Sequence, residues 1–385
     1  MNLVETDNYQ TYELVVVGTG FFGATIARLF ADTYKRPVLI LEKRNHIGGN
    51  AWSEFDPQTG IEIHKYGSHL FHTNNERVWQ FVNRFDSFTN YSHKVFTKHQ
   101  NQFYPMPINL LTISTFFGRA FTPREAKQFF DGFRNSHNST INFESEALKS
   151  VGKDLYEAFY RGYTTKQWQV DPADLPKEIF TRIPIRYDFN QRYFDDKYEG
   201  LPSSGYGTLL TRILTDDNIH VALRTDYFDF KEHFKDKLVI YTGPLDRYFD
   251  FSHGVLGWRT LDFELEYVPV NDFQGNSVVN YADLDVPYTR IHEFKHLHSE
   301  RQYTLDKTVI MKEFSRKADA NDEPYYPINS TFDRELLEHY RLLARSESKV
   351  LFGGRLGTYK YLDMHMAIAS AFSMFENDIR EKFAS

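Results

Sequence analysis

A glycine-rich loop near the start of the chain has the residue types and spacing of a dinucleotide-binding site. The loop Gly18–Gly23 (GTGFFG) follows the apolar run Leu14–Val17 and precedes a segment with helical spacing, Ala24 to Asp32. Glycines there permit a tight turn and a close approach to a pyrophosphate, which the N–H groups of a helix N-terminus attract. Glu42 ends a second apolar run, Val38–Leu41, where a carboxylate can accept hydrogen bonds from ribose hydroxyls. The alternative is a structural turn without a ligand.

The elements that must position this loop form a βαβ unit, because continuous apolar runs bounded by glycine are typical of buried parallel strands. The strand-like runs return late in the chain. Leu238–Ile240 precedes a glycine turn, and Val350–Phe352 precedes a helix predicted from about Asp363 to Ile379. We therefore expect the α/β domain to be assembled from separate stretches of sequence.

Two regions with other residue patterns separate these stretches. From about residue 75 to 192 amphipathic helical segments dominate, for example Pro123 to Phe133, which begins at the start signal Thr122-Pro123. After about residue 246 the pattern alternates, as in Thr260 to Pro269 and Thr308 to Phe314, which is typical of an antiparallel sheet. We see no internal repeat and no low-complexity linker.

Composition and charge exclude several classes of function. The 385 residues are 41% apolar and 25% charged, as in ordinary globular proteins, but 17% aromatic, which favours large stacking surfaces. The net charge of −7 does not suit a general nucleic-acid or anionic-membrane binder, so an anionic ligand requires a few placed arginines. No cysteine is present, which excludes disulfides and thiolate catalysis. Without a signal-peptide pattern or an apolar run long enough to span a membrane, we expect a cytoplasmic protein.

A flavin is the dinucleotide that later segments favour. Lys43–Asn50 (KRNHIGGN) resembles the flavoprotein branch that includes amine oxidases, where a second glycine pair wraps the chain around the FAD pyrophosphate. Leu201–Gly207 (LPSSGYG) and Phe352–Arg355 (FGGR) resemble two further FAD contacts of that branch. We find no second GxGxxG motif for NADPH.

Four further stretches, in this order along the chain, carry a closer resemblance: His64–Thr73 (HKYGSHLFHT), Gly162–Trp168 (GYTTKQW), Asp285–Arg290 (DVPYTR) and Gly353–Met364 (GGRLGTYKYLDM). With these motifs the chain resembles the UDP-galactopyranose mutase family, bacterial type, over nearly its whole length beyond the first ten residues.

The resemblance implies an isomerase that interconverts UDP-galactopyranose and UDP-galactofuranose by ring contraction, without net redox change, in cell wall biogenesis. In the family, N5 of reduced FAD attacks the anomeric carbon and expels UDP, and the sugar recloses from a flavin N5–sugar adduct. It also implies a homodimer. Together with the residue patterns described above, the resemblance predicts an α/β protein. Its Rossmann-like FAD-binding domain is discontinuous and comprises residues 1–75, about 200–245 and 340–385. A helical domain, about 76–195, is inserted, and an antiparallel β-sheet domain covers about 246–335.

Matching the family's motifs residue by residue implies the site. Arg182 and Arg290 match the arginines that bind the diphosphate and stabilise its departure, and the region of His69 lies against the flavin; these three are the predicted catalytic residues. Residues predicted to bind FAD are Gly18, Gly20, Phe22, Gly23, Glu42, Arg44, Gly49, Asn50, His69, Arg355 and Met364. Residues predicted to bind the substrate are Phe159, Tyr163, Thr164, Trp168, Arg182, Tyr193, Arg259, Asn280, Arg290, Tyr326, Tyr361 and Asp363.

Several of these assignments have ordinary alternatives. Phe159 and Tyr163 lie four residues apart on a predicted helix, so they share a face and can stack on uracil, but Phe159 also suits core packing. The alternative for Tyr193, Tyr326 and Tyr361 is that they are core tyrosines of a tyrosine-rich protein. The family's matching segment, here residues 162–182, is a mobile lid that carries Trp168. His93 departs from relatives that carry asparagine there.

His64, His69 and His72 do not predict a metal site, because their spacing is loose and no carboxylate or cysteine completes a ligand set. Three alternatives to the predicted reaction stay open. One is a mutase for UDP-N-acetylgalactosamine or dTDP-fucose. The second is a flavin oxidoreductase such as an amine oxidase. The third is a non-catalytic FAD-fold carrier like the Rab escort proteins.

Overall fold

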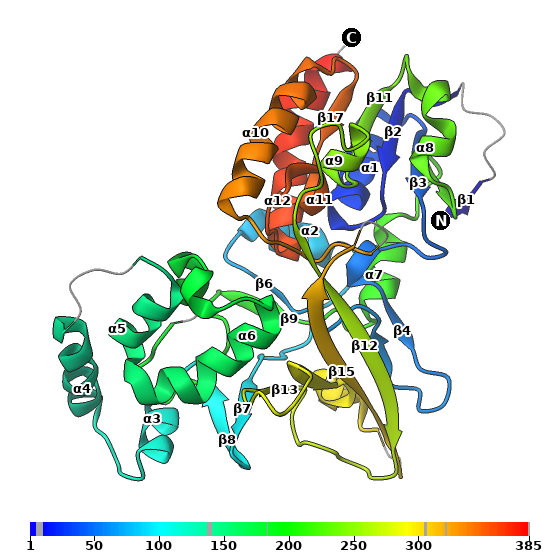
Figure 1. Ribbon diagram of the computed structural model, residues 1–385. Coiled ribbons are helices and arrows are strands. Elements are labelled where there is room, and N and C mark those ends of the chain that lie inside the picture. Colours follow the sequence, from blue (N-terminus) through cyan, green and yellow to red (C-terminus); the bar gives the residue numbers. More distant parts are fainter. Residues whose placement is uncertain (5–10, 137–140, 183, 304–305, 320–321, 384–385) are drawn as a thin grey trace.

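A six-stranded parallel sheet forms one layer of the molecule (Figure 1). The computed structural model describes residues 1–4, 11–136, 141–182, 184–303, 306–319 and 322–383. Its strands follow the order β1 (Asn2–Leu3), β10 (Ile219–Leu223), β3 (Val38–Glu42), β2 (Leu14–Val17), β11 (Leu238–Tyr241) and β17 (Val350–Phe352). Every neighbouring pair is parallel. The buried apolar runs predicted as strands are strands β2, β3, β11 and β17, and the α/β prediction is confirmed.

Helices cover both faces of this sheet. One face packs on α1 (Phe21–Tyr34), α7 (Tyr206–Ile213) and α12 (Met364–Met374, extended by a π-helical turn Phe375–Ile379). An aromatic cluster with Tyr227, Phe234 and Tyr248 covers the other face. The helices on that side and beyond are α8 (Tyr227–Phe230), α9 (Leu245–Tyr248), α10 (Thr331–Ser346) and α11 (Gly354–Thr358), with a 3-10 turn at Lys231–Phe234. A 3-10 turn at Arg380–Lys382 follows α12 on the first face.

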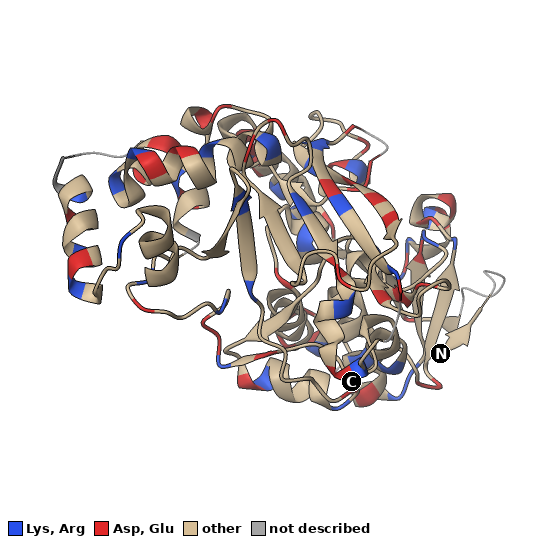
Figure 2. Ribbon diagram, turned by 90° about the horizontal axis from the view of Figure 1, so that it is seen from below, with Lys and Arg blue, Asp and Glu red and all other residues tan. Residues whose placement is uncertain are grey.

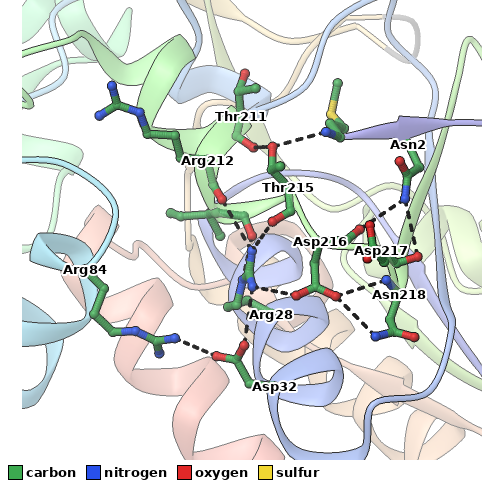
Figure 3. Close-up of polar contacts among 12 residues, drawn as sticks. Asn2, Arg28, Asp32, Arg84, Thr211, Arg212, Thr215, Asp216, Asp217 and Asn218 are labelled. Atoms are coloured by element: carbon green, nitrogen blue, oxygen red, sulfur yellow. Dashed lines mark hydrogen bonds and ion pairs between the residues drawn. The ribbon is translucent and has the colours of Figure 1, made fainter.

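A buried arginine fastens α7 to α1 (Figure 3). The Arg28 guanidinium donates from Nε to the carbonyl of Ile213 at 2.8 Å and from Nη2 to that of Thr215 at 2.7 Å. It also pairs with Asp216 at 3.0 Å and with Asp32 at 3.3 Å. A cation is favourable at the C-terminus of a helix, where carbonyls lack partners within the helix. Arg28 therefore fixes the helix behind the glycine loop without belonging to a site.

A second sheet has seven strands in the order β16 (Tyr326–Pro327), β12 (Trp258–Val268), β15 (Thr308–Lys317), β14 (Arg290–Glu293), β13 (Val278–Tyr281), β7 (Val95–His99) and β8 (Gln102–Met106). The pairing is antiparallel except between β13 and β7, which are parallel. Strands β7 and β8 lie inside the range predicted as helical, so that prediction is wrong for residues 95–106. The two strands form a short hairpin whose turn lies at Gln100 and Asn101, both with positive φ. Apolar and polar residues alternate over too few positions in this hairpin for the sequence to predict it.

Most helices between residues 76 and 195 gather in a separate lobe (Figure 1). Its core is aromatic, with Phe130, Phe143 and Tyr156 among the buried residues. The helices of this range are α2 (Glu76–Asn83), α3 (Leu110–Phe116), α4 (Pro123–Ser136), α5 (Phe143–Leu155), a π-helix (Tyr156–Arg161), α6 (Gly162–Trp168) and 3-10 turns at Pro172–Asp174 and Lys177–Arg182. The division into three domains at the stated boundaries stays a prediction.

Short elements connect the layers: β4 (Ser53–Phe55) with β5 (Glu62–His64), β6 (Phe71–Thr73) with β9 (Tyr198–Gly200), and 3-10 turns at Gly49–Ala51 and Phe294–Arg301. Among the described residues, no helix combines the length and apolar character needed to cross a membrane. Figure 2 shows Lys and Arg interspersed with Asp and Glu along the ribbon. An anion must therefore be bound by particular side chains.

Candidate active site

The glycine loop connects β2 to α1 as the sequence predicts, and two of its glycines are required by geometry. Gly18 has a φ of 100°, and a Cβ there would lie 2.4 Å from Oγ1 of Thr242. A Cβ on Gly23 would lie 2.1 Å from the carbonyl oxygen of Gly18. Gly20 caps α1 and offers no side-chain acceptor. The first N–H groups of α1 are therefore open to an anion.

The Glu42 carboxylate, 5% exposed, lies beside this loop at the end of β3. Its Oε2 accepts from the backbone N–H of Thr19 at 3.0 Å and from the Thr19 hydroxyl at 2.5 Å. Its Oε1 accepts from the N–H of Arg44 at 3.0 Å. These bonds hold the carboxylate in place at the carboxyl end of the parallel strands.

Arg44 joins the second glycine-containing segment, at Asn50, to the segment between β15 and β16, at Glu323. Its Nη2 donates to Asn50 at 2.8 Å and to Glu323 at 2.9 Å, and its guanidinium lies 4.5 Å over the Tyr66 ring. Burial opposes its charge, but Glu323 and the Tyr66 phenol raise the pKa of Arg44 above its usual value. The Nη1 atom is buried and has no hydrogen-bond partner. Such a donor is costly unless a ligand satisfies it.

One cleft of about 1240 Å³, its open mouth included, runs along the glycine loop and past the N-terminus of α12. Every residue predicted to bind the cofactor lines it: Gly18, Gly20, Phe22, Gly23, Glu42, Arg44, Gly49, Asn50, His69, Arg355 and Met364. Sequence reasoning missed the lining residues that follow β11 and β10, such as Thr242 and Thr225. The carboxyl ends of adjacent parallel strands were the available signal.

The His69 imidazole faces this cleft and is neutral at ordinary pH. Burial, with the charge of Arg355, lowers the pKa of His69 to about 4 although a bond to Gly67 opposes the shift. Its Nδ1 lies 2.8 Å from the carbonyl oxygen of Gly67, so Nδ1 carries the proton and donates. Nε2 of the neutral ring is thus an acceptor.

A second cluster centres on Arg290, at the start of β14. Its Nη2 donates to the Tyr163 hydroxyl on α6, and its Nε lies 3.3 Å from Oε1 of Glu313 on β15. Burial opposes the charge, but Glu313 and the phenols of Tyr163, Tyr326 and Tyr193 raise the pKa of Arg290 well above its usual value. The guanidinium is therefore permanently charged.

Glu313 and His292 connect this arginine to the His69 loop. The buried His292 ring has Nε2 3.1 Å from the Glu313 carboxylate and Nδ1 2.7 Å from the Ser68 hydroxyl. Burial lowers the pKa of His292, so its neutral ring donates from Nε2 and accepts at Nδ1. Neither Glu313 nor His292 was predicted from the sequence, because their contacts join distant strands.

The predicted substrate tyrosines lie around these two clusters. Tyr326 and Tyr361 stack with ring centroids 5.6 Å apart, and the Arg355 guanidinium lies 5.1 Å from the Tyr361 ring. Tyr193 donates its backbone N–H to the carbonyl of His93 at 2.8 Å. Burial and Arg290 lower the pKa of His93 to about 3, so its ring is neutral.

Phe159 is 3% exposed and packs against Tyr104 and Phe116, with ring centroids 4.9 and 5.3 Å apart. Thr164 is buried and Trp168 is half-buried. Core packing accounts for the position of Phe159, and its contact with uracil stays a prediction.

Two predicted polar residues lie on the second sheet. Arg259 is 2% exposed and donates to the carbonyl of Gln167 at 3.2 Å and to Ser315 at 3.0 Å. Asn280 pairs directly opposite Arg290, and its Oδ1 is buried without a partner. Arg259 therefore holds the end of α6, whereas Asn280 presents an unsatisfied acceptor beside Arg290.

Two further predicted residues complete the description. Arg182 ends the 3-10 turn Lys177–Arg182, and its side chain lies outside the described residues. Asp363 caps α12 without a side-chain cap bond. Its carboxylate lies near His72 and His365, with potential ligand atoms within 4.8 Å of one another, a grouping that sequence spacing did not indicate.

Comparisons with known proteins agree with this description. A model of the family "UDP-galactopyranose mutase" matches residues 158–361, more than half of the chain. A model described as "NAD(P)-binding Rossmann-like domain" matches residues 16–85.

Two curated relatives cover nearly the full chain. A "Probable UDP-galactopyranose mutase" of Klebsiella pneumoniae is 41% identical, covering 93% of this chain and 92% of its own. A "dTDP-fucopyranose mutase" of Escherichia coli is 39% identical, covering 93% and 96%.

Solved structures show the same fold. A reduced UDP-galactopyranose mutase superposes with a TM-score of 0.71 at 14% identity, covering 97% of this chain and 95% of that one. A protein titled "Putative protoporphyrinogen oxidase" of Exiguobacterium superposes with a TM-score of 0.61 at 12% identity, covering 97% of this chain and 100% of that one. At these identities the likeness shows the fold alone.

Proposed function

The chain belongs to the UDP-galactopyranose mutase family, and from this premise we propose that it interconverts UDP-galactopyranose and UDP-galactofuranose with a reduced FAD bound. One observation carries the proposal. The nucleotide cleft and the permanently charged Arg290 are joined by a series of side-chain contacts. Ser68, beside His69, bonds the buried His292, which bonds the buried Glu313, the partner of Arg290. This arrangement brings a cofactor site and a diphosphate-binding cation together.

The residues of the cleft fit FAD. The open N–H groups of α1 suit the pyrophosphate, Glu42 suits a ribose, and the unpaired Nη1 of Arg44 offers a donor. When bound and reduced, the flavin supplies an electron-rich N5 able to attack the anomeric carbon of a sugar. Neutral His69 can accept a hydrogen bond at Nε2 beside it.

Arg290 supplies the electrostatics of the reaction. Because Glu313 and Tyr163 keep its guanidinium charged and oriented, it can bind a diphosphate and stabilise the charge that develops as UDP departs. Arg182 is proposed as the second diphosphate ligand. The unsatisfied Oδ1 of Asn280 can accept from an N–H or hydroxyl group of the nucleotide sugar.

A second substrate is favoured by a specific observation, because the dTDP-fucopyranose mutase relative is nearly as similar, at 39% against 41% identity. A pocket difference of one or two side chains can switch between such sugars. The test incubates the dithionite-reduced protein with UDP-galactofuranose or dTDP-fucofuranose and separates the products by HPLC. We expect the higher kcat/KM with UDP-galactofuranose. The reverse preference identifies a dTDP-fucose mutase, and turnover of neither refutes the proposal.

We propose from the family resemblance that the protein works as a cytoplasmic homodimer. Size-exclusion chromatography with light scattering tests this, and a mass equal to one chain of 45.4 kDa refutes it.

A further inference from the structure

Helix α6 contacts the irregular segment 281–288 through two residues one helical turn apart. Gly162 lies so close that a Cβ there would be 2.3 Å from the carbonyl oxygen of Ala282. One turn later, the Lys166 ammonium is surrounded by four backbone carbonyls. Its Nζ lies 2.7 Å from the oxygen of Tyr281, 2.8 Å from Asp283, 2.9 Å from Val286 and 3.0 Å from Tyr288.

Such an arrangement uses a lysine as an internal cation. An ammonium has three N–H donors, so the four carbonyls share them. Segment 281–288 begins with the last residue of β13 and leads to β14. Carbonyl groups of such a turn need hydrogen-bond partners when they are removed from water. Lys166 satisfies four of them at once and thereby determines the shape of the turn that ends at Arg290.

The opposite side and the end of α6 are also held. Tyr163 receives a hydrogen bond from Arg290. The carbonyl of Gln167 accepts from Arg259 at 3.2 Å and from Ser315 at 2.6 Å. The helix ends at Trp168, and the next residue, Gln169, caps it with a left-handed φ of 53°. The Gln169 side chain accepts a hydrogen bond from the N–H of Lys317 at 3.2 Å. Both ends of α6 are thus bound to the second sheet.

We propose that Lys166 is a positioning residue that holds α6 and segment 281–290 together, so that Tyr163 meets Arg290 in the geometry that binds the diphosphate. The movable part of the lid then begins after Gln169, and not at Gly162 as expected from the sequence. This inference rests on the proposed function for its effect on substrate, but the contact itself can be tested without substrate.

The first test measures amide hydrogen exchange in the FAD-loaded protein without substrate. Lys166→Met removes the ammonium but keeps a long side chain. We expect exchange in segment 281–290 and in α6 to accelerate about tenfold, the scale of lost charged hydrogen bonds. Lys127→Met, an exposed lysine on α4, is the matched control and should match the wild type. FAD content should stay constant, because no α6 residue lines the nucleotide cleft.

A second variant separates the contact from general loss of folding. Lys166→Ala leaves four carbonyl oxygens that surround the position of the ammonium at 2.7 to 3.0 Å. Backbone carbonyl oxygens arranged around an ion can replace the hydration shell of potassium. Ammonium or potassium ions should restore slow exchange in segment 281–290, whereas choline at equal ionic strength should not. If the variant exchanged faster because of a structural defect elsewhere, ammonium or potassium would slow the exchange no more than choline does.

Kinetics complete the test. We expect Lys166→Met to raise KM for the nucleotide sugar about tenfold with a smaller change in kcat, because the ammonium does not touch the substrate. Wild-type exchange in segment 281–290 of Lys166→Met overturns the inference, whether or not the protein turns over UDP-galactofuranose. Absent turnover in the wild type together with faster exchange in the variant refutes the proposed function and leaves the contact intact.

Discussion

Arg290 is the side chain on which the proposed chemistry depends most directly. The buried carboxylate of Glu313 holds its charge, and its Nη2 contacts the phenol of Tyr163. A guanidinium aimed at a departing diphosphate acts mainly in the transition state.

We predict that Arg290→Ala lowers kcat by about 10²–10³, the usual effect of removing one such donor. FAD content should not change, because Arg290 does not line the nucleotide cleft. Arg316→Ala is the matched control, since Arg316 pairs with Asp262 and Asp322 on the exposed side of β15. A kcat near that of the wild type in Arg290→Ala removes this arginine from the site.

Glu313 gives a prediction on stability and pH. Burial opposes its ionisation, but Arg290 and His292 outweigh burial and lower the pKa of the carboxyl below its usual 4.5. A depressed pKa contributes stability that is present above the unfolded-state value and is lost as the pH falls through the native-state value.

Glu313→Gln should therefore lower the free energy of unfolding by about 3 kcal/mol at neutral pH, the cost of breaking a buried ion pair. The difference from the wild type should persist down to about pH 5 and begin to narrow below 4.5, where the carboxyl becomes protonated in the unfolded state. It should narrow further until the native carboxyl, whose pKa is lower, is protonated as well. Urea titrations of both proteins at pH 7, 5.5 and 4 measure this difference in the free energy of unfolding. A difference that is constant across this range contradicts the assigned role.

Residues with local signals could be predicted from the sequence, and residues whose roles depend on distant pairing could not. Gly18 and Glu42 follow strands whose apolar runs are visible, so their positions in the cleft were predictable. Lys166 donates to backbone carbonyls that lie more than a hundred residues later in the sequence. Glu313 on β15 is paired with Arg290 on the neighbouring strand β14. The spacing of apolar residues along the sequence does not predict contacts of this kind.

At the scale of elements, the start of α12 lies beside the cleft. Leu362, Met364 and Ala367 line the cleft, and Asp363 makes no side-chain cap bond. The first N–H groups and the positive end of the helix dipole thus lie at the cleft, where they would favour the anionic reduced state of the proposed flavin.

A carboxylate added at this end should oppose that effect. We predict that Ala367→Asp lowers the midpoint potential of the bound flavin by about 20 mV, the order expected for one charge in the first helical turn. Met366→Asp, on the exposed side of the same turn, is the control. Reduction in equilibrium with a reference dye measures the midpoint potential of each variant. Equal potentials for Ala367→Asp and Met366→Asp would contradict the position of the helix end beside the flavin.

The lid gives a second prediction at this scale. If the segment after Gln169 closes over bound nucleotide, the environment of the half-buried Trp168 changes while α6 stays in place. UDP should alter the tryptophan emission of the wild type and of Trp79→Phe, but not of Trp168→Phe. A UDP response that survives in Trp168→Phe assigns the signal elsewhere and contradicts closure at this tryptophan.

The hairpin of β7 and β8 marks the limit of prediction for elements. Residues 95–106 lie between amphipathic helices, and their strands are stabilised by pairing with β13, nearly two hundred residues later. The helices around them were predictable because each carries its own apolar face.

At the scale of the whole molecule, the parallel sheet and the second sheet each supply half of the proposed site. The first presents a nucleotide cleft at the carboxyl ends of its strands, as open α/β sheets do. The second presents Arg290, Asn280 and Glu313 on adjoining strands. The fold is shared with oxidases, so architecture alone does not distinguish isomerisation from oxidation.

The redox state of the flavin distinguishes these two chemistries. An isomerase that returns its electrons unchanged should turn over UDP-galactofuranose only after reduction with dithionite, without net consumption of the reductant. An oxidase should work in air, reduce its flavin with substrate and release hydrogen peroxide. We expect product by HPLC from the reduced protein under argon, none above background from the air-oxidised protein, and no peroxide in either. Arg290→Ala is the control, because its reduced form should retain flavin and lose turnover. Full activity of the air-oxidised protein, or peroxide formed in proportion to substrate, would place this chain with the oxidases that share its fold.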